Sequence, residues 1–238
     1  MGDASFPSVG ADSIGWLTTE QMVEVDRIMI EELGIELMQM MENAGRNLAR
    51  LAIDRYEPTN VTVCAGPGGN GGGGLVAARH LAVAGVDVHI VLTADRDRFT
   101  PVPAHQLSII DRMKLPVADA VSASTDLILD AVIGYSLHGA PRGRAAEVIR
   151  QMTATDAPIL SLDTPSGLDT STGLAADPHI NADATMTLAL PKQGLRDHSA
   201  VGELFLADIS VPPSVYEAMR VGPSPDFRPG PLLRIVAT

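Results

Sequence analysis

Polar side chains able to bind a cation or move a proton stand where three short segments of the sequence end. Asp130 lies in LILDAVIG, Asp163 and Ser166 lie in LSLDTPSGLD, and Asn70 lies in a glycine-rich stretch. An aspartate in an apolar run is costly to bury unless it is paired or coordinates an ion. Oxygen ligands from these residue types suit a hard cation rather than zinc. Each residue alone could equally cap a turn, and only their convergence on one edge of a sheet favours a site.

The stretch GPGGNGGGG (66–74) indicates a second chemistry, the binding of phosphate. It follows the apolar run VTVCA and precedes LVAARHLAVAG, which has helical spacing. Backbone without Cβ atoms approaches a phosphate closely, and a helix N-terminus offers free N–H groups and the positive end of its dipole. Seven glycines in these nine positions would be costly in entropy for a merely flexible loop. The pattern therefore favours a ligand-binding segment.

The same glycines leave a different enzyme class open. Gly66, Gly68 and Gly71 match the G-x-G-x-x-G dinucleotide fingerprint, and Asp95 follows the second apolar run at a spacing that suits a ribose contact. A nicotinamide-dependent oxidoreductase is therefore an alternative. A P-loop NTPase is not, because the stretch lacks the G-K-[ST] that this class requires.

Further charged residues lie in turns near the same predicted edge. Lys192 follows the run ATMTLAL in LPKQGL, where a solvated surface position and a functional one are about equally expected. His138, Arg142 and Arg144 lie in a loop after Gly134. For these three, solvent exposure is the favoured interpretation, although the arginines could bind phosphate.

The elements that position these residues alternate between short apolar runs and helical stretches. This alternation predicts βαβ units and a mostly parallel sheet with helices on both faces. Before them, Thr18 and Gln21 fit a capping box that opens a helix ending at Gly34, and a second helix begins near Ile35. The expected strands cover residues 61–65, 86–92, 127–133, 158–163, 184–190 and 203–208, and the expected helices cover 73–84, 103–114, 143–153 and 213–220.

Composition narrows the function classes. The net charge of −12 disfavours nucleic-acid and anionic-membrane binding, and no apolar run has the length of a membrane span. The single cysteine, Cys64, lies in an apolar run, where we expect a buried packing thiol. With no signal-peptide pattern at the start, the sequence predicts a cytoplasmic protein. We expect a disordered tail over 1–17, one α/β domain over 18–221 and a proline-rich tail over 222–238.

Five segments together resemble the NAD(P)H-hydrate epimerase family, also called the YjeF N-terminal domain. They occur in the family's order and spacing within residues 16–211: MENAGR (41–46), GPGGNGGGGLVAARHL (66–81), DAVIG (130–134), LDTPSGLD (162–169) and ADATMTLALPKQGL (182–195). The resemblance implies a Rossmann-like three-layer sandwich that often forms a homodimer. It also implies interconversion of the C6 epimers of hydrated NADH or NADPH, with a separate dehydratase acting on the same metabolite.

The resemblance also implies roles for residues. Asn70, Asp130 and Ser166 would be ligands of a potassium ion. Asp163 would contact the substrate, and as a carboxyl group beside the C6 hydroxyl it is our candidate proton donor and acceptor. To the substrate-binding residues we add Lys192 from its position. The remaining expected contacts come from two loops, at Gly69, Asn70, Gly71, Gly72 and Gly73 and at Gly134, Tyr135, Ser136, Leu137, His138, Gly139 and Ala140.

Two positions depart from the family pattern G-P-G-N-N-G-G-D-G. Gly69 stands where the family has an asparagine, and Gly73 stands where it has an aspartate. The fold and the expected potassium ligands are unaffected, whereas an amide and a carboxylate are missing from the substrate loop. A non-catalytic or substrate-shifted binding or dimerising module of the same fold is therefore an alternative to the epimerase.

Overall fold

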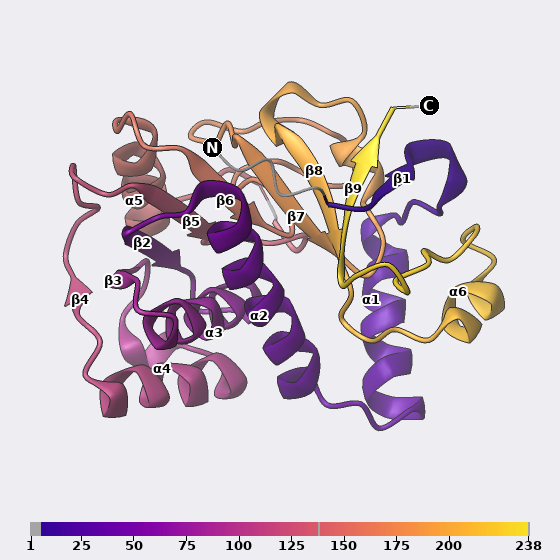
Figure 1. Cartoon of the computed structure of the whole chain (residues 1–238), viewed down its shortest axis with the longest axis horizontal. Helices are drawn as coiled ribbons and strands as arrows, with labels where there is room; N and C mark the ends of the chain where they lie inside the picture. The colour runs from indigo at the N-terminus through magenta and orange to yellow at the C-terminus, as the bar shows by residue number, and fades with distance from the viewer. Residues whose placement is uncertain (1–5, 138, 238) are drawn as a thin grey trace.

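One central sheet organises the chain in the computed structural model, which describes residues 6–137 and 139–237 (Figure 1). Its strand order is β1-β9-β8-β7-β6-β5-β2-β3-β4, and neighbouring strands are parallel except β8 and β9. The strands are β1 (Ser8–Gly10), β2 (Asn60–Ala65), β3 (Asp87–Leu92), β4 (Val117–Ala118), β5 (Leu127–Ala131), β6 (Ile159–Leu162), β7 (Ala184–Leu188), β8 (Glu203–Ala207) and β9 (Leu232–Val236). All six predicted strands are present, with ends that differ by at most two residues.

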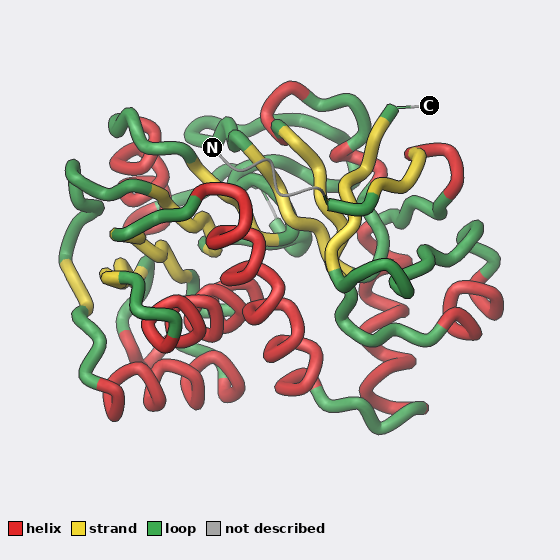
Figure 2. The backbone as a smooth tube through the Cα atoms, in the orientation of Figure 1, coloured by secondary structure: helices red, strands yellow, loops and turns green. Residues whose placement is uncertain are grey.

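Helices cover both faces of the sheet, as the alternation predicts (Figure 2). They are α1 (Thr19–Arg27), α2 (Leu37–Tyr56), α3 (Gly69–Val83), α4 (Pro101–Met113), α5 (Gly143–Thr153) and α6 (Pro213–Met219). One core cluster joins α2, α3 and α4 to one face of the sheet, and separate clusters join α5, and α1 with α6, to the other. The three-layer α/β architecture is thereby confirmed.

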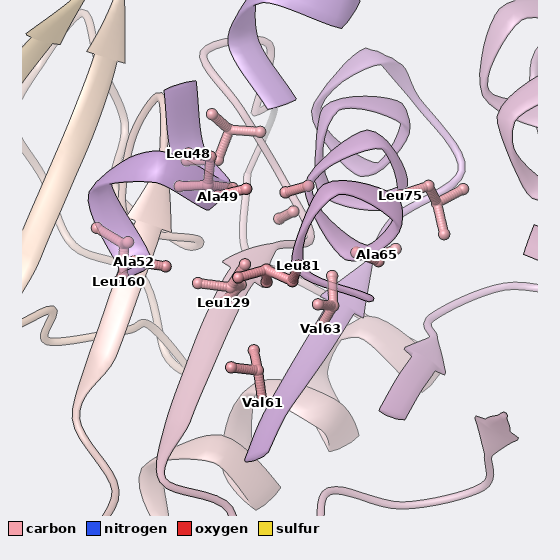
Figure 3. Close-up of a cluster of buried hydrophobic side chains, with 14 of the residues drawn as sticks. Leu48, Ala49, Ala52, Val61, Val63, Ala65, Leu75, Leu81, Leu129 and Leu160 are labelled. Carbon is pink, nitrogen blue, oxygen red and sulfur yellow. The ribbon is translucent and has the colours of Figure 1, made fainter. Parts of the chain in front are cut away.

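The strands are apolar on both sides because each side is covered. Val61, Val63 and Ala65 of β2 point into the cluster beneath α2 and α3, whereas Cys64 points into the cluster beneath α5 (Figure 3). A parallel sheet between two helical layers requires such continuous apolar runs. Each fully buried valine or leucine contributes roughly 1.5–3 kcal/mol of transfer free energy. The expected packing role of Cys64 is confirmed, and burial raises the pKa of its thiol.

The glycine-rich segment differs from the expected loop. Helix α3 begins at Gly69 instead of residue 73, so most of the glycines lie in its first turns and are buried. A Cβ atom at Gly71 would overlap the carbonyl oxygen of Gly66, and one at Gly74 would lie 2.5 Å from Ala131 Cβ. The glycines therefore bring the amino end of α3 against β5 and the preceding turn, which no other residue type allows.

The ends of the chain correct the expected tails. Residues 8–10 form β1, which pairs with β9 near the other end of the chain, so residues 6–17 are not the expected disordered tail. Residues 232–236 pair with β8 as well, and the Phe6 ring lies 5.1 Å from that of Phe205. These partners come from distant parts of the chain and leave no local signal. None of the described helices combines the length and apolar character of a membrane-spanning segment.

The amino-terminal helices agree with the sequence at their starts. The Thr18 side chain accepts the Gln21 N–H and the Gln21 side chain accepts the Thr18 N–H, so the capping box is confirmed. A π-helical turn (Ile28–Glu32) continues α1, and Gly34 at φ 67° follows it. The turn at Gly34 joins α1 to α2, and both helices lie over the carboxyl ends of the strands (Figure 1).

Candidate functional site

A cavity of about 430 Å³ lies at the carboxyl ends of β2, β5, β6 and β7, and residues of α1 and α2 form part of its wall. The structure brings seven of the expected substrate-binding residues to its wall: Gly69, Asn70, Gly73, Gly134, Tyr135, Ser136 and Asp163. The other expected contacts that are described lie outside this wall, namely Gly71, Gly72, Leu137, Gly139, Ala140 and Lys192. His138 lies outside the described residues.

Asp163 forms a buried ion pair with Lys192 at the floor of this site. The Lys192 ammonium donates to Asp163 Oδ1, to Thr187 Oγ1 at 3.3 Å and to the Leu188 carbonyl at 3.0 Å. The Lys192 side chain is 0% exposed and that of Asp163 is 4% exposed. A solvated surface lysine is therefore excluded, and the Lys192 ammonium lies beneath the cavity, paired with Asp163 and 5.9 Å from the centroid of the Tyr135 ring.

Backbone geometry fixes the carboxylate of Asp163 toward the cavity. Asp163 ends β6 with φ 67°, a left-handed conformation that aspartate and asparagine adopt more readily than most residues. Its Oδ2 atom accepts the backbone N–H of Tyr135 at 3.2 Å. The carboxylate thus joins the ends of β5 and β6, where the sequence predicted it.

Asp130 lies at the end of β5 and is fully buried. Its Oδ1 accepts the Ser166 hydroxyl at 2.5 Å and the Val132 N–H at 3.3 Å. Its Oδ2 accepts the Ser166 N–H and the Ser161 hydroxyl, both at 2.8 Å. Burial raises the pKa of Asp130, and these hydrogen bonds oppose that change. Ser161, on β6, is a partner that the sequence analysis missed.

The oxygen atoms around Asp130 are of the type that binds hard cations. Ser166 Oγ also lies 3.3 Å from the Ile133 carbonyl. If the hydroxyl donates to that carbonyl instead of to Asp130 Oδ1, a lone pair of Oδ1 and one of Ser166 Oγ become available to a cation. Asn70 lies beside Gly134, in the segment that follows β5, because a Cβ atom at Gly134 would lie 3.3 Å from Asn70 Oδ1. The Asn70 amide nitrogen is buried without a hydrogen-bond partner. A carboxylate and a hydroxyl oxygen therefore meet at the end of β5, and the Asn70 amide lies beside the segment that follows it.

Asp26 adds a second carboxyl group that the sequence analysis missed. It lies on α1, lines the same cavity and accepts the Tyr135 hydroxyl at 2.6 Å. Burial raises the pKa of Asp26, while the Tyr135 hydrogen bond and the Lys192 charge lower it. The sequence could have indicated this residue, because Asp26 lies one helical turn after Met22 and so places a carboxyl group on the apolar face of the predicted helix. Tyr135 thus connects two carboxyl groups, Asp163 at its N–H and Asp26 at its hydroxyl.

Comparisons with known proteins agree on one family. Residues 37–194 match the family described as YjeF-related protein N-terminus. The NAD(P)H-hydrate epimerase of Dehalogenimonas lykanthroporepellens is 45% identical over 218 residues, which cover 89% of this chain and 88% of that protein. The NAD(P)H-hydrate epimerase of Truepera radiovictrix is 38% identical over 208 residues, covering 85% and 92%.

Two further similarities concern a longer protein and a solved structure. The bifunctional NAD(P)H-hydrate repair enzyme Nnr of Hyperthermus butylicus is 37% identical over 204 residues, which are 81% of this chain and 38% of that protein. The crystal structure of yeast ynu0 superposes with a TM-score of 0.81 over 92% of this chain and 99% of its own, at 24% identity. The yeast structure supports the fold alone.

Proposed function

The chain belongs to the family of YjeF-related protein N-termini, and from this premise we propose that it is an NAD(P)H-hydrate epimerase, an isomerase acting on hydrated NADH and NADPH. The observation that carries the proposal is the fixed Asp163 carboxylate in a cavity bordered by the amino end of α3. The names of the relatives favour this function over an oxidoreductase and over a non-catalytic module.

The proposed reaction needs proton transfer and no redox change. C6 of the hydrated ring carries a hydroxyl beside the ring nitrogen, so protonation releases that hydroxyl as water and leaves a cation delocalised onto the nitrogen. A water molecule then adds to C6 from the opposite face and loses a proton, which restores the hydrate as its other epimer. One proton is taken up and one is released, so the reaction needs acid–base groups alone.

Asp163 and the Asp26–Tyr135 pair supply such groups in this proposal. Asp163 comes from β6 and Asp26 from α1, so the two carboxyl groups approach the cavity from different elements. We assign proton exchange with the C6 hydroxyl to Asp163. Burial raises the pKa of Asp26, which lines the cavity and accepts the Tyr135 hydroxyl. Apolar side chains of α1 and α2, such as Met22 and Met41, line the cavity opposite these groups.

A potassium ion would fit the oxygens of Asp130, Ser166 and Asn70. When bound there, it would offset the charge of the buried Asp130 carboxylate and order the segments after β2 and β5. The support is the oxygen composition of the cluster, a carboxylate and a hydroxyl in direct contact. This assignment predicts that activity depends on potassium.

The two glycines that depart from the family pattern leave the cavity intact. A Cβ atom at Gly69 would meet nothing within 4 Å, and one at Gly73 would lie 2.8 Å from Leu162 Cδ2. Gly69 therefore enlarges the open side of the cavity, whereas Leu162 occupies the space beside Gly73. This supports a working site with fewer polar contacts to the substrate.

Homodimer formation, a cytoplasmic location and a separate dehydratase remain proposals. The methionines of the amino-terminal helices are mostly buried within the chain, including Met22 and Met29. Exposed apolar side chains remain at Val23, Ile30 and Leu33, and these support a dimer contact through this part of the chain. Light scattering at micromolar concentration tests the dimer, and a monomer would contradict it.

An epimer-resolved chromatographic assay tests the proposed function. Each C6 epimer of hydrated NADH and NADPH is purified and incubated with the protein in potassium or in sodium buffer. We expect the protein to speed equilibration of the two epimers, and to do so more in potassium. Equilibration at the spontaneous rate for both cofactors, in both buffers, would refute the proposal.

A further inference from the structure

A second cavity of about 1230 Å³ adjoins the first along the same edge of the sheet. It lies over the carboxyl ends of β2, β3, β4 and β5 and shares Val132 and Ile133 with the first cavity. Pro67 lines the second cavity and Gly68 lines the first, so the turn before α3 separates them. The two cavities therefore lie side by side along the sheet edge, on either side of this turn.

The boundary between the cavities is the point at which the strand order reverses. From β2 the chain moves outward through β3 and β4, and it then returns to β5 on the other side of β2. Open α/β sheets bind ligands in the crevice at such a reversal, and a dinucleotide spans it with one half on each side. The topology therefore favours a ligand that extends into both cavities.

The second cavity is unusually rich in arginine for an acidic chain. The chain has a net charge of −12, yet four arginines and three aspartates line this cavity: Arg96, Arg98, Arg142, Arg144, Asp95, Asp97 and Asp119. Arg96 pairs with Asp111 at 2.8 Å, and Arg144 bonds the Asp119 carbonyl and lies 3.4 Å from Glu147. In the described ranges, Arg98 and Arg142 form no ion pair, so their guanidinium groups are available to a ligand.

Among the described residues, the first cavity lacks the cationic side chains that would bind the phosphates of a dinucleotide. No arginine, lysine or histidine is among the described residues that line it, and Lys192 beneath it is held by Asp163. Its volume of about 430 Å³ lies in the lower part of the range that holds one drug-sized molecule, roughly 300–1,000 Å³. It therefore suits the hydrated nicotinamide half, while the phosphates and the adenosine half require a second, cationic region.

We propose that Arg98 and Arg142 bind a phosphate group of the adenosine half of the substrate in this second cavity. Arginine suits this role because its planar guanidinium binds phosphate oxygens through two parallel hydrogen bonds. The amino end of α3 lines the first cavity next to Pro67, which lines the second, so its backbone N–H groups lie where the connecting pyrophosphate would enter the first cavity. This inference rests on the proposed function, because it assigns the second half of the same substrate.

Binding of adenylate fragments tests the inference without any need for catalysis. The full chain and an Arg98→Ala/Arg142→Ala variant are titrated with 5′-AMP and with 2′,5′-ADP by calorimetry. The control is Arg112→Ala/Arg150→Ala, which removes two exposed helical arginines outside the cavity. Since a hydrogen bond to a charged group is worth about 1.5 kcal/mol or more, each lost arginine weakens binding about tenfold.

We expect the cavity variant to lose at least tenfold in affinity for one or both fragments, with the control within twofold of wild type. A larger loss for 2′,5′-ADP assigns the arginines to the 2′-phosphate, and an equal loss assigns them to the 5′-phosphate. Failure of both fragments to bind wild type, or equal affinity in the cavity variant, would overturn the inference. An inactive protein that still shows the expected loss would contradict the epimerase proposal alone.

Steady-state kinetics test the arginine assignment separately from the epimerase activity. With hydrated NADH or NADPH, the cavity variant should lower kcat/KM mainly through a higher KM, because Arg98 and Arg142 lie away from the reacting ring. An active enzyme whose kcat/KM falls no more in this variant than in the control would overturn the arginine assignment and leave the epimerase activity standing.

Discussion

Replacing Asp163 by asparagine is the most informative change, because it removes a proton-transfer group and one partner of a buried ion pair. Asparagine has nearly the same size and tolerates the left-handed conformation at φ 67°, so the backbone of the turn should persist. Lys192, however, is fully buried and would lose its counter-charge. Breaking a buried pair in this way costs about 3–5 kcal/mol.

The stability loss must be separated from the loss of chemistry. For a chain of this size, about 3–5 kcal/mol corresponds to a fall in Tm of roughly 6–20 °C. The double variant Asp163→Asn/Lys192→Met removes both charges and should recover most of that fall, since no unpaired charge remains. Neither variant has a carboxyl group at position 163, so both should epimerise about 10²- to 10⁴-fold more slowly than wild type.

The measurement combines thermal unfolding with the epimer-resolved assay at a temperature where all variants are folded. Lys192→Met alone is the matched control, because it retains Asp163 and breaks the same pair. The reasoning fails if the double variant is as stable as wild type and epimerises within a few-fold of it. Asp163 would then be a turn residue, and the Asp26–Tyr135 pair would be the remaining acid–base group.

Four further predictions follow from the geometry of the site. Asp26→Asn removes a carboxyl group whose pKa is raised in the folded state. The free energy of unfolding of wild type should therefore fall relative to that of the variant as pH rises from about 4 through the raised pKa. Denaturant unfolding measures this difference, and parallel pH curves for the two proteins would contradict it. Gly71→Ala should destabilise the fold by about 3 kcal/mol because its Cβ meets backbone, whereas Gly69→Ala should be neutral or stabilise by up to about 1 kcal/mol, and equal melting temperatures would refute the contrast. Asn70→Ala should abolish the difference between rates in potassium and sodium, and an unchanged ratio would remove Asn70 from the ligands. Gly69→Asn/Gly73→Asp should lower KM at unchanged Tm if the missing polar contacts alone distinguish this loop, since a Cβ at Gly73 meets only the terminal methyl group Cδ2 of Leu162. A large fall in Tm would show that the space is not available.

Much of the fold was determined by local patterns in the sequence. Runs such as VTVCA are apolar on both faces, and this alone predicts a strand covered by two helical layers. The Thr18–Gln21 capping box and the placement of Asp130 and Asp163 at strand ends were likewise predicted, because parallel strands bring their carboxyl ends to one edge. Such features depend on residues a few positions apart, and the sequence displays them directly.

The tertiary structure decided which distant groups meet. For Lys192 the sequence left a surface position and a functional one about equally expected, and only its packing beside Asp163 makes it a buried counter-ion. Asp26 and Tyr135 are 109 positions apart, and their hydrogen bond depends on the way α1 folds over the sheet. The pairing of β1 with β9 is equally non-local. A charged side chain is stable in the interior only where a partner compensates for its lost hydration, and that partner is chosen by the packed fold rather than by neighbouring residues.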